Sequence, residues 1–107
     1  MRGVKKDGGK LPIGIVCQRQ FPKAIAGVAE CSKFGHDKYH ETDVDWCNIH
    51  RVDNGVERYM NAMYRHMQDA GPELSGRCSE TGIEHVKHAA WNALAMLELI
   101  QRQKNDD

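Results

Sequence analysis

The segment SETGIEHVKHAAWNALAMLELI, residues 79–100, decides the fold of this 107-residue chain. Apolar side chains recur in it every three or four residues, which is the spacing of an amphipathic helix. Thr81 is followed three residues later by Glu84, and this capping-box pattern predicts a helix over residues 82–103. The expected apolar stripe comprises Ile83, Val86, Ala90, Leu94, Leu97 and Ile100.

Polar side chains lie beside that stripe. At 100° per residue, Glu84, His85, His88 and Asn92 fall within an arc of about 100°. Carboxylate, imidazole and amide groups on one helix face can build a site, but no strong motif such as HExxH is present. For this helix alone, an ordinary polar surface is the favoured interpretation.

Two further helices are predicted on the N-terminal side. Residues 23–34 end before Gly35, and glycine favours helix termination. Residues 56–70 follow the turn sequence Asp53-Asn54-Gly55 and end before Gly71-Pro72. The expected inner faces are Ile25, Val28, Ala29 and Ser32 on the first helix, and Val56, Met60, Met63 and Met67 on the second.

Together these stretches predict a single domain over residues 1–107, an all-α bundle of three main helices with a loop-rich N-terminal part. Residues 1–10 and 104–107 are expected to be flexible, whereas the apolar residues of 11–16 are expected to pack over an edge of the core. The third helix is apolar on more than one side between Ala89 and Leu97. Such a helix needs partners on several sides, so we expect a homo-oligomer to complete the bundle.

Composition excludes several classes of function. Lys+Arg and Asp+Glu both number 15, so the chain has no net charge to attract duplex nucleic acid. No apolar stretch is long enough for a membrane span, and the N-terminus lacks the apolar run of a signal peptide, which together predict a cytoplasmic protein. The four cysteines include no CxxC pair and are expected to be reduced thiols.

Several short motifs become specific when they are taken together. They are DGGK (7–10), FGxxKY (34–39), Trp46, Arg65-His66 and ExGxxHxxHAAWNA (80–93). Their order and spacing, over about residues 7–99, resembles the phage dATP/dGTP diphosphohydrolase family, which is regarded as akin to the all-α, MazG-like nucleoside triphosphate pyrophosphatases. The resemblance implies hydrolysis of a (deoxy)nucleoside triphosphate, with dATP or dGTP as the expected substrate, to monophosphate and pyrophosphate. It also implies a requirement for Mg²⁺ or Mn²⁺, an oligomer, and a role in a phage nucleotide pool within an infected bacterium.

The resemblance also implies roles for individual residues, since phosphoryl transfer needs cations around the phosphates and a positioned water. The expected catalytic residues are Glu80, His85 and Arg65, and the expected metal ligands are Glu80, His85 and His88. Lys10, Lys38 and Arg65 are expected to neutralise phosphate, and Tyr39 or Trp46 to stack on the base. The remaining expected substrate-binding residues are His66 and Asn92.

The chain also departs from the family pattern. Cys78 stands where the family commonly has an aspartate, and Glu30 is the only carboxylate within the first helix, where MazG-like enzymes carry EExxE. Because Mg²⁺ favours oxygen ligands, this small carboxylate set supports a second hypothesis. In it, the protein binds a nucleotide, or a cyclic or ADP-ribose-type defence signal, without turning it over. A third hypothesis is an interaction module whose polar stripes are simply solvated.

Overall fold

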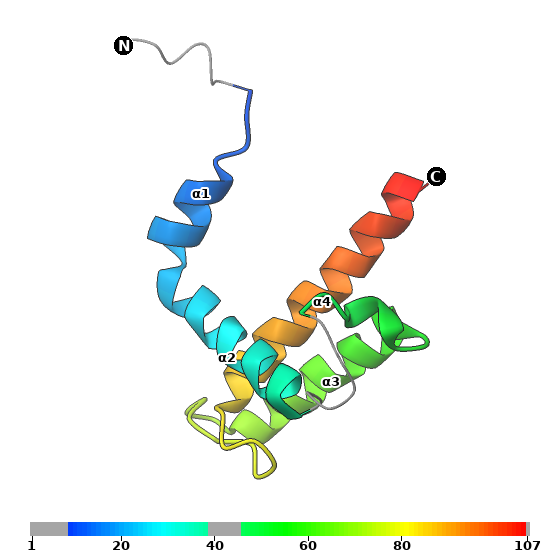
Figure 1. Cartoon of the computed structure of the whole chain (residues 1–107). Coiled ribbons are helices and arrows are strands. Elements are labelled where there is room, and N and C mark those ends of the chain that lie inside the picture. Colours follow the sequence, from blue (N-terminus) through cyan, green and yellow to red (C-terminus); the bar gives the residue numbers. More distant parts are fainter. Residues whose placement is uncertain (1–8, 39–45, 107) are drawn as a thin grey trace.

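The computed structural model describes residues 9–38 and 46–106. Three long helices form the body of the molecule: α2 (Pro22–Lys38), α3 (Gly55–Ala70) and α4 (His85–Asp106). Helix α4 packs mainly against α3 and secondarily against α2 (Figure 1). The prediction of an all-α fold is confirmed, because the described ranges contain helices and only an isolated bridge between Arg77 and Glu84. Within those ranges, no helix combines the length and apolar character needed to cross a bilayer.

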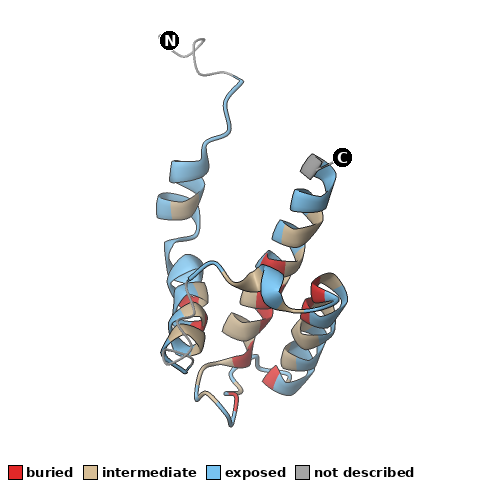
Figure 2. Cartoon of the chain, turned by 45° about the vertical axis from the view of Figure 1, so that its right-hand side comes forward, coloured by how far each residue is buried: buried red, intermediate tan, exposed pale blue. Residues whose placement is uncertain are grey.

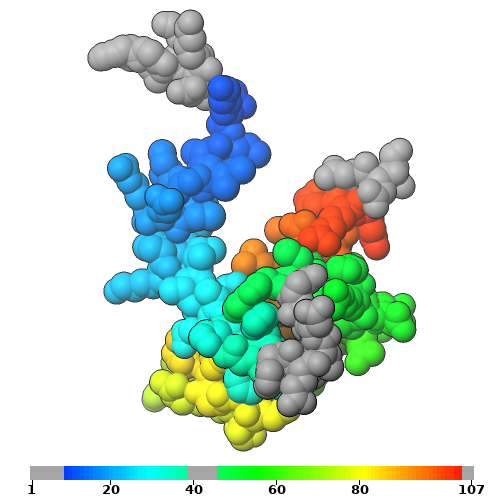
Figure 3. All heavy atoms as spheres, viewed as in Figure 1, coloured from blue at the N-terminus to red at the C-terminus, as the bar shows by residue number. Residues whose placement is uncertain are grey.

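The N-terminal residues stand away from this body. A three-residue turn of helix, α1 (Ile13–Ile15), continues into a π-helical turn, η2 (Val16–Gln20), and both project beyond the start of α2 (Figures 1 and 3). Leu11 and Ile13 are exposed, so the prediction that this apolar stretch packs on the core is wrong for a single chain. The reason is geometric, since the backbone leaves helical conformation at Phe21 (φ −128°) and the segment continues outward from the end of α2.

Helix α2 is longer than predicted and packs through a different face. It continues through Gly35 to Lys38, because Gly35 keeps a negative φ and a helical glycine costs only about 1 kcal/mol relative to alanine. Its buried residues are Gly27 and Cys31, whereas the predicted inner-face residues Ile25 and Ala29 are exposed. A Cβ at Gly27 would lie 3.0 Å from Cγ of Lys87, so the missing side chain allows α2 to approach α4 closely.

Helix α3 begins and ends where the turn residues predict. Asn54 adopts a left-handed conformation (φ 55°) just before the helix, and Gly71 (φ 82°) follows its last residue. Tyr59 is buried, and its hydroxyl donates a 2.9 Å hydrogen bond to the carbonyl of Ile49. This bond ties the short helix η4 (Ile49–Arg51) to α3. Of the predicted methionine stripe, Met67 is exposed.

Helix α4 (His85–Asp106) begins three residues after its predicted start at residue 82, and it buries a different face from the predicted one. The threonine hydroxyl of Thr81 accepts the N–H of Ile83 (3.1 Å), and the N–H of His85 donates to the carbonyl of Gly76 (2.9 Å), so no capping box forms with Glu84. The buried residues of α4 are small or polar, and they lie along the centre of the molecule (Figure 2); they are His85, Ala89, Asn92 and Ala95. The prediction that the apolar stripe faces the core is wrong for Ala90, Leu94 and Leu97, which are exposed.

Candidate functional site

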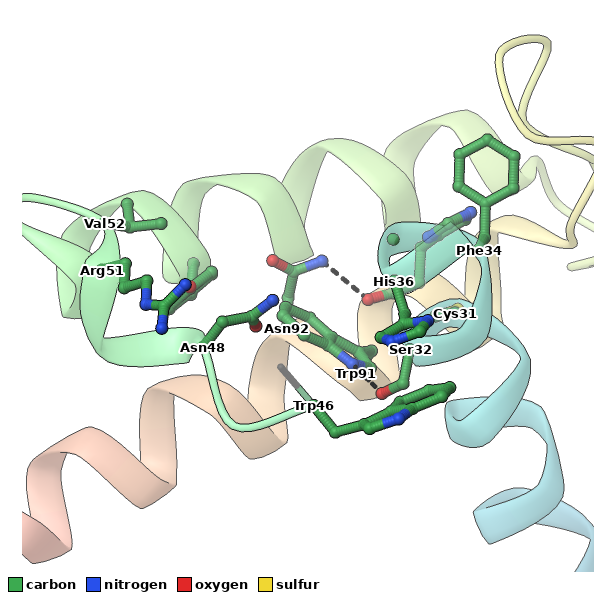
Figure 4. Close-up of a pocket in the computed structure, with 13 residues that line it drawn as sticks. Cys31, Ser32, Phe34, His36, Trp46, Asn48, Arg51, Val52, Trp91 and Asn92 are labelled. Atoms are coloured by element: carbon green, nitrogen blue, oxygen red, sulfur yellow. Dashed lines mark hydrogen bonds between the residues drawn. The ribbon is translucent and has the colours of Figure 1, made fainter. Parts of the chain in front are cut away.

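A cavity of about 500 Å³ lies between the C-terminal half of α2, residues 46–52, α3 and α4. In Figure 4, Arg51 and Asn48 lie at one end of it and His36 and Phe34 at the other. A cavity of this size and mixed lining is typical of a small-molecule site. Its aromatic lining residues are Phe34, Trp46, Tyr59 and Trp91, and its polar ones are Ser32, His36, Asn48, Arg51, His88 and Asn92.

One wall of the cavity is a stack of two aromatic rings. The His36 and Trp46 rings lie parallel, with centroids 4.1 Å apart and an interplanar angle of 4°. Nδ1 of His36 is shielded from solvent and has no hydrogen-bond partner among the described residues, although Oδ1 of Asp37 lies 3.5 Å away. Trp46 is exposed at the rim, so its ring has accessible surface for a further flat group.

The inner wall is held by contacts between helices. The indole N–H of Trp91 donates to Oγ of Ser32 over 2.8 Å, which joins α4 to α2. The Trp91 ring also meets Tyr59 edge-on, with centroids 5.6 Å apart. Burial raises the pKa of the neighbouring Cys31 thiol to about 11, so this cysteine stays protonated at neutral pH and is no nucleophile.

Asn92 presents an amide group on the same wall. Its Nδ2–H donates to the backbone carbonyl of His88 over 2.8 Å, which fixes the orientation of the amide (Figure 4). Asn92 is 8% exposed and lines the cavity together with Asn48 and Arg51. Amide groups can pair with the polar edge of a base, and a guanidinium group can bind phosphate oxygens in a fork.

Three histidines from two helices meet beside the cavity. Nδ1 of His66 on α3 and Nδ1 of His85 on α4 are 2.8 Å apart, so one ring donates its proton to the other. The His66 ring also stacks on His88 at 4.7 Å, and Nε2 of His88 is 2.7 Å from the hydroxyl of Thr81. Burial is the main cause that lowers the pKa of His66, with further lowering from the other two histidines. Burial and the proximity of His85 lower the pKa of His88, so the His66 and His88 rings are neutral at pH 7.

The carboxylates near these helices are already paired with cations. Nζ of Lys87 is 2.6 Å from Oε2 of Glu30 and 3.1 Å from Oε2 of Glu84, and Glu84 also contacts Arg77 at 3.2 Å. Among the described residues, no group of three or more His, Cys, Asp or Glu side chains is arranged to hold a metal ion. The predicted metal ligands, Glu80, His85 and His88, are therefore not arranged as a preformed metal site within the described part of one chain.

The structure brings some of the predicted site residues together and leaves others apart. Trp46, His88 and Asn92 line the cavity, and His66 and His85 contact His88 or one another. Arg65 and Glu80 are exposed on the surface, where Arg65 lowers the pKa of His66 and Glu80 raises that of His88 through space. Lys10 precedes α1 and Lys38 ends α2, and neither lines the cavity, whereas Tyr39 lies outside the described residues.

Sequence reasoning missed several cavity residues. Arg51 and Asn48 follow Trp46 in a stretch with no periodic pattern, and Ser32 and Tyr59 occupy positions typical of helix interiors. His36 had a usable signal, because it lies within the FGxxKY motif on the same helix as Ser32.

Comparison with known proteins places these features in a family. Residues 1–107 match the family described as dATP/dGTP diphosphohydrolase, N-terminal. The chain is also similar to a protein of Salmonella phage PMBT28 named dATP/dGTP diphosphohydrolase, with 26% identity over 107 residues. The alignment covers all of this chain and 33% of that relative, so the chain spans about a third of its length. No solved structure gives a significant match.

Proposed function

The chain belongs to the dATP/dGTP diphosphohydrolase N-terminal family, and from this we propose that it binds a purine deoxynucleoside triphosphate and hydrolyses it to the monophosphate and pyrophosphate. The observation that carries the proposal is the cavity beside the three histidines. It combines aromatic faces for a base, amides for the base edge and a guanidinium for phosphate, next to neutral imidazoles. The size of the cavity, about 500 Å³, suits a nucleotide.

In this proposal, the base lies near Trp46 and His36, and the triphosphate lies between His88 and Arg51, which both line the cavity. His88 is the one histidine of the cluster that also lines the cavity. As a neutral ring, it can accept a proton from an attacking water, and Thr81 holds the ring in place. Exposed Arg65 supplies positive charge next to His66, where the departing pyrophosphate needs it.

Mg²⁺ or Mn²⁺ remains part of the proposal as an ion that arrives with the nucleotide. Mg²⁺ is commonly held by substrate phosphates and only one or two carboxylates, so a preformed cage is not required. Glu80 is exposed and lies close enough to His88 to affect its pKa, which makes it the carboxylate best placed to contribute. The ion would neutralise phosphate charge.

Membership of this family also suggests where and in what form the chain acts. We propose that the chain acts as a homo-oligomer in the cytoplasm of an infected bacterium and shapes a phage nucleotide pool. The relative from a Salmonella phage supports a phage origin of the activity.

A second function, binding of a nucleotide or nucleotide-like defence signal without turnover, is favoured by one observation. Lys87 on α4 already neutralises two carboxylates, Glu30 on α2 and Glu84 in the turn just before α4. A charge pair of this kind occupies the oxygens that a catalytic metal would use. The cavity serves binding in either case.

The test is to incubate the full chain with each dNTP and Mg²⁺ or Mn²⁺ and to measure pyrophosphate. We expect Glu80→Gln and His88→Gln to lower turnover by roughly a hundredfold while nucleotide binding persists. Arg65→Ala should weaken both binding and turnover, because it contacts phosphate in the substrate and in the transition state. Arg58→Ala is the matched control, because Arg58 is an exposed arginine seven residues earlier on α3. It should leave nucleotide binding and turnover unchanged. Binding without pyrophosphate release in the parent would instead establish the second function.

A further inference from the structure

The amide group of Asn92 has a fixed orientation in the wall of the cavity. Its Nδ2–H donates to the backbone carbonyl of His88 over 2.8 Å. Because a carbonyl only accepts, this bond decides which end of the amide is the nitrogen and turns the oxygen the other way. In Figure 4 the Asn92 oxygen points away from that bond, toward the end of the cavity at which Asn48 and Arg51 lie.

The oxygen of this amide is an acceptor that the fold does not use. Oδ1 of Asn92 has no hydrogen-bond partner among the described residues, although the residue is only 8% exposed. The atom is not shielded, because within the described ranges Nδ1 of His36 is the only buried side-chain nitrogen or oxygen without a partner. An accessible acceptor on a mostly buried residue favours a ligand that donates to it, since an unpaired polar group there is unfavourable.

The other polar groups of this wall are occupied and hold it in place. Oγ of Ser32 accepts the indole N–H of Trp91 over 2.8 Å, and the hydroxyl of Tyr59 donates to the carbonyl of Ile49 over 2.9 Å. Trp91 precedes Asn92 on α4 and meets the Tyr59 ring edge-on. The helices around Asn92 are therefore fixed before a ligand arrives, which lowers the conformational cost of binding to its oxygen.

We propose that Oδ1 of Asn92 accepts a hydrogen bond from the 3′-hydroxyl of the deoxyribose, so that the cavity recognises nucleotides that carry this hydroxyl. The inference rests on the proposed function and names the sugar contact of the same cavity. The base lies near Trp46 and His36 in that proposal, and the triphosphate reaches Arg51. The sugar joins the two and therefore passes Asn92, which lies between these ends in Figure 4. The second hydrogen of Nδ2 stays available for the edge of the base.

The chemistry of the oxygen disfavours two other partners. Ionised phosphate oxygens are acceptors and have no proton to donate to an amide oxygen. Mg²⁺ is commonly bound through one or two carboxylates, and none of the described residues that line the cavity is Asp or Glu. A donor on the nucleoside remains, and the 3′-hydroxyl is the donor that the sugar of a deoxynucleotide offers.

The test removes the donor from the ligand. The ligands are the α,β-imido analogues of dATP and of 2′,3′-dideoxyATP, which differ only in the 3′-hydroxyl. Both resist cleavage at the α,β bridge, so calorimetry with Mg²⁺ measures affinity without turnover. The parent chain should bind the dideoxy analogue at least about tenfold more weakly, because Oδ1 then stays unpaired in a desolvated site. The corresponding pair made from dGTP and 2′,3′-dideoxyGTP should show the same difference.

The matching protein variant removes the acceptor. Asn92→Leu should bind the dATP analogue about tenfold more weakly than the parent and should bind the two analogues within about twofold of each other. The carbonyl of His88 keeps the helical N–H of residue 92, so circular dichroism should be parental. Asn92→Ala makes the same comparison with a strong helix former if the leucine variant does not fold. Gln103→Leu is the control, because it removes an exposed amide from the same helix outside the cavity, and it should keep both affinities.

The outcomes separate this inference from the proposed function. A parent that binds both analogues equally overturns the sugar contact while nucleotide binding stands, and so does an Asn92 variant that prefers the hydroxyl as strongly as the parent. A third ligand, the α,β-imido triphosphate of purine 2′-deoxyriboside, lacks the amine of adenine. If Asn92→Leu abolishes discrimination against this ligand in place of the dideoxy one, Asn92 contacts the base and the inference is wrong.

Two further results bear on both proposals. A parent that binds no nucleotide overturns the proposed function and the sugar contact together. A parent that distinguishes the analogues through Asn92 but releases no pyrophosphate from dATP supports the sugar contact and contradicts hydrolysis.

Discussion

The hydrogen bond between Trp91 and Ser32 provides a measurable link between the helices that enclose the cavity. Trp91→Phe removes the indole N–H and part of the ring, and we expect a loss of about 1–2 kcal/mol, a fraction of the ~3–5 kcal/mol for removing a whole aromatic side chain. Ser32→Ala leaves the half-buried N–H of Trp91 without its 2.8 Å acceptor, which costs about 1–2 kcal/mol. The double variant should cost less than the sum, because the bond can be lost only once.

The expected coupling energy is about 0.5–1.5 kcal/mol, the net worth of one hydrogen bond between neutral groups. It is measured by urea unfolding of the parent, both single variants and the double variant at one fixed protein concentration, because association shifts apparent stability. Ser75→Ala, at an exposed serine of the loop after α3, should change stability by less than ~0.5 kcal/mol. Additivity within ~0.3 kcal/mol would refute the role of this bond in joining α2 to α4.

The histidine cluster gives two further predictions. The pKa values of His66 and His88 are lower in the folded chain than the ~6.5 of an unfolded histidine, so the unfolded state binds more protons below that pH. The free energy of unfolding should therefore be highest above about pH 6.5 and should decrease as the pH falls toward the folded pKa values. Urea unfolding midpoints at pH 7.5, 6.5 and 5.5 measure this decrease. Equal midpoints at the three pH values would contradict the prediction. Thr81→Val removes the partner of His88 and the acceptor for Ile83 N–H, and should cost about 1–2 kcal/mol and lower turnover, whereas Thr81→Ser should retain both.

The fold class was predictable because its signals are local. Amphipathic spacing identified three long helices, and Gly71 and the Asn54-Gly55 turn marked both ends of α3 correctly. The errors lie where tertiary contacts outweigh a local preference. Gly35 remains helical, and Thr81 turns its hydroxyl to Ile83 and His88 rather than capping the helix with Glu84.

The site was predictable only in part, because periodicity relates residues within one helix. The spacing of His85 and His88 placed them on a common arc, and the structure shows both at the cluster. The meeting of His66 with these two depends on how α3 crosses α4, which no local pattern specifies. The position of Arg51 in the cavity also depends on a contact between elements, because the Tyr59 hydroxyl on α3 holds η4 in place.

Helix α4 buries a different face from the predicted one, and the apolar residues that this leaves exposed bear on the proposed homo-oligomer. Helices approach most closely where side chains are small, and the buried residues of α4 include Ala89 and Ala95, with His85 and Asn92 buried beside them. Leu94 and Leu97 are then left facing outward. Burying a leucine contributes about 1.5–3 kcal/mol, so covering these two leucines would stabilise the proposed homo-oligomer. The apolar pattern of this helix therefore serves two purposes: its small residues pack within the chain, and its outward leucines leave a surface that the proposed homo-oligomer can cover.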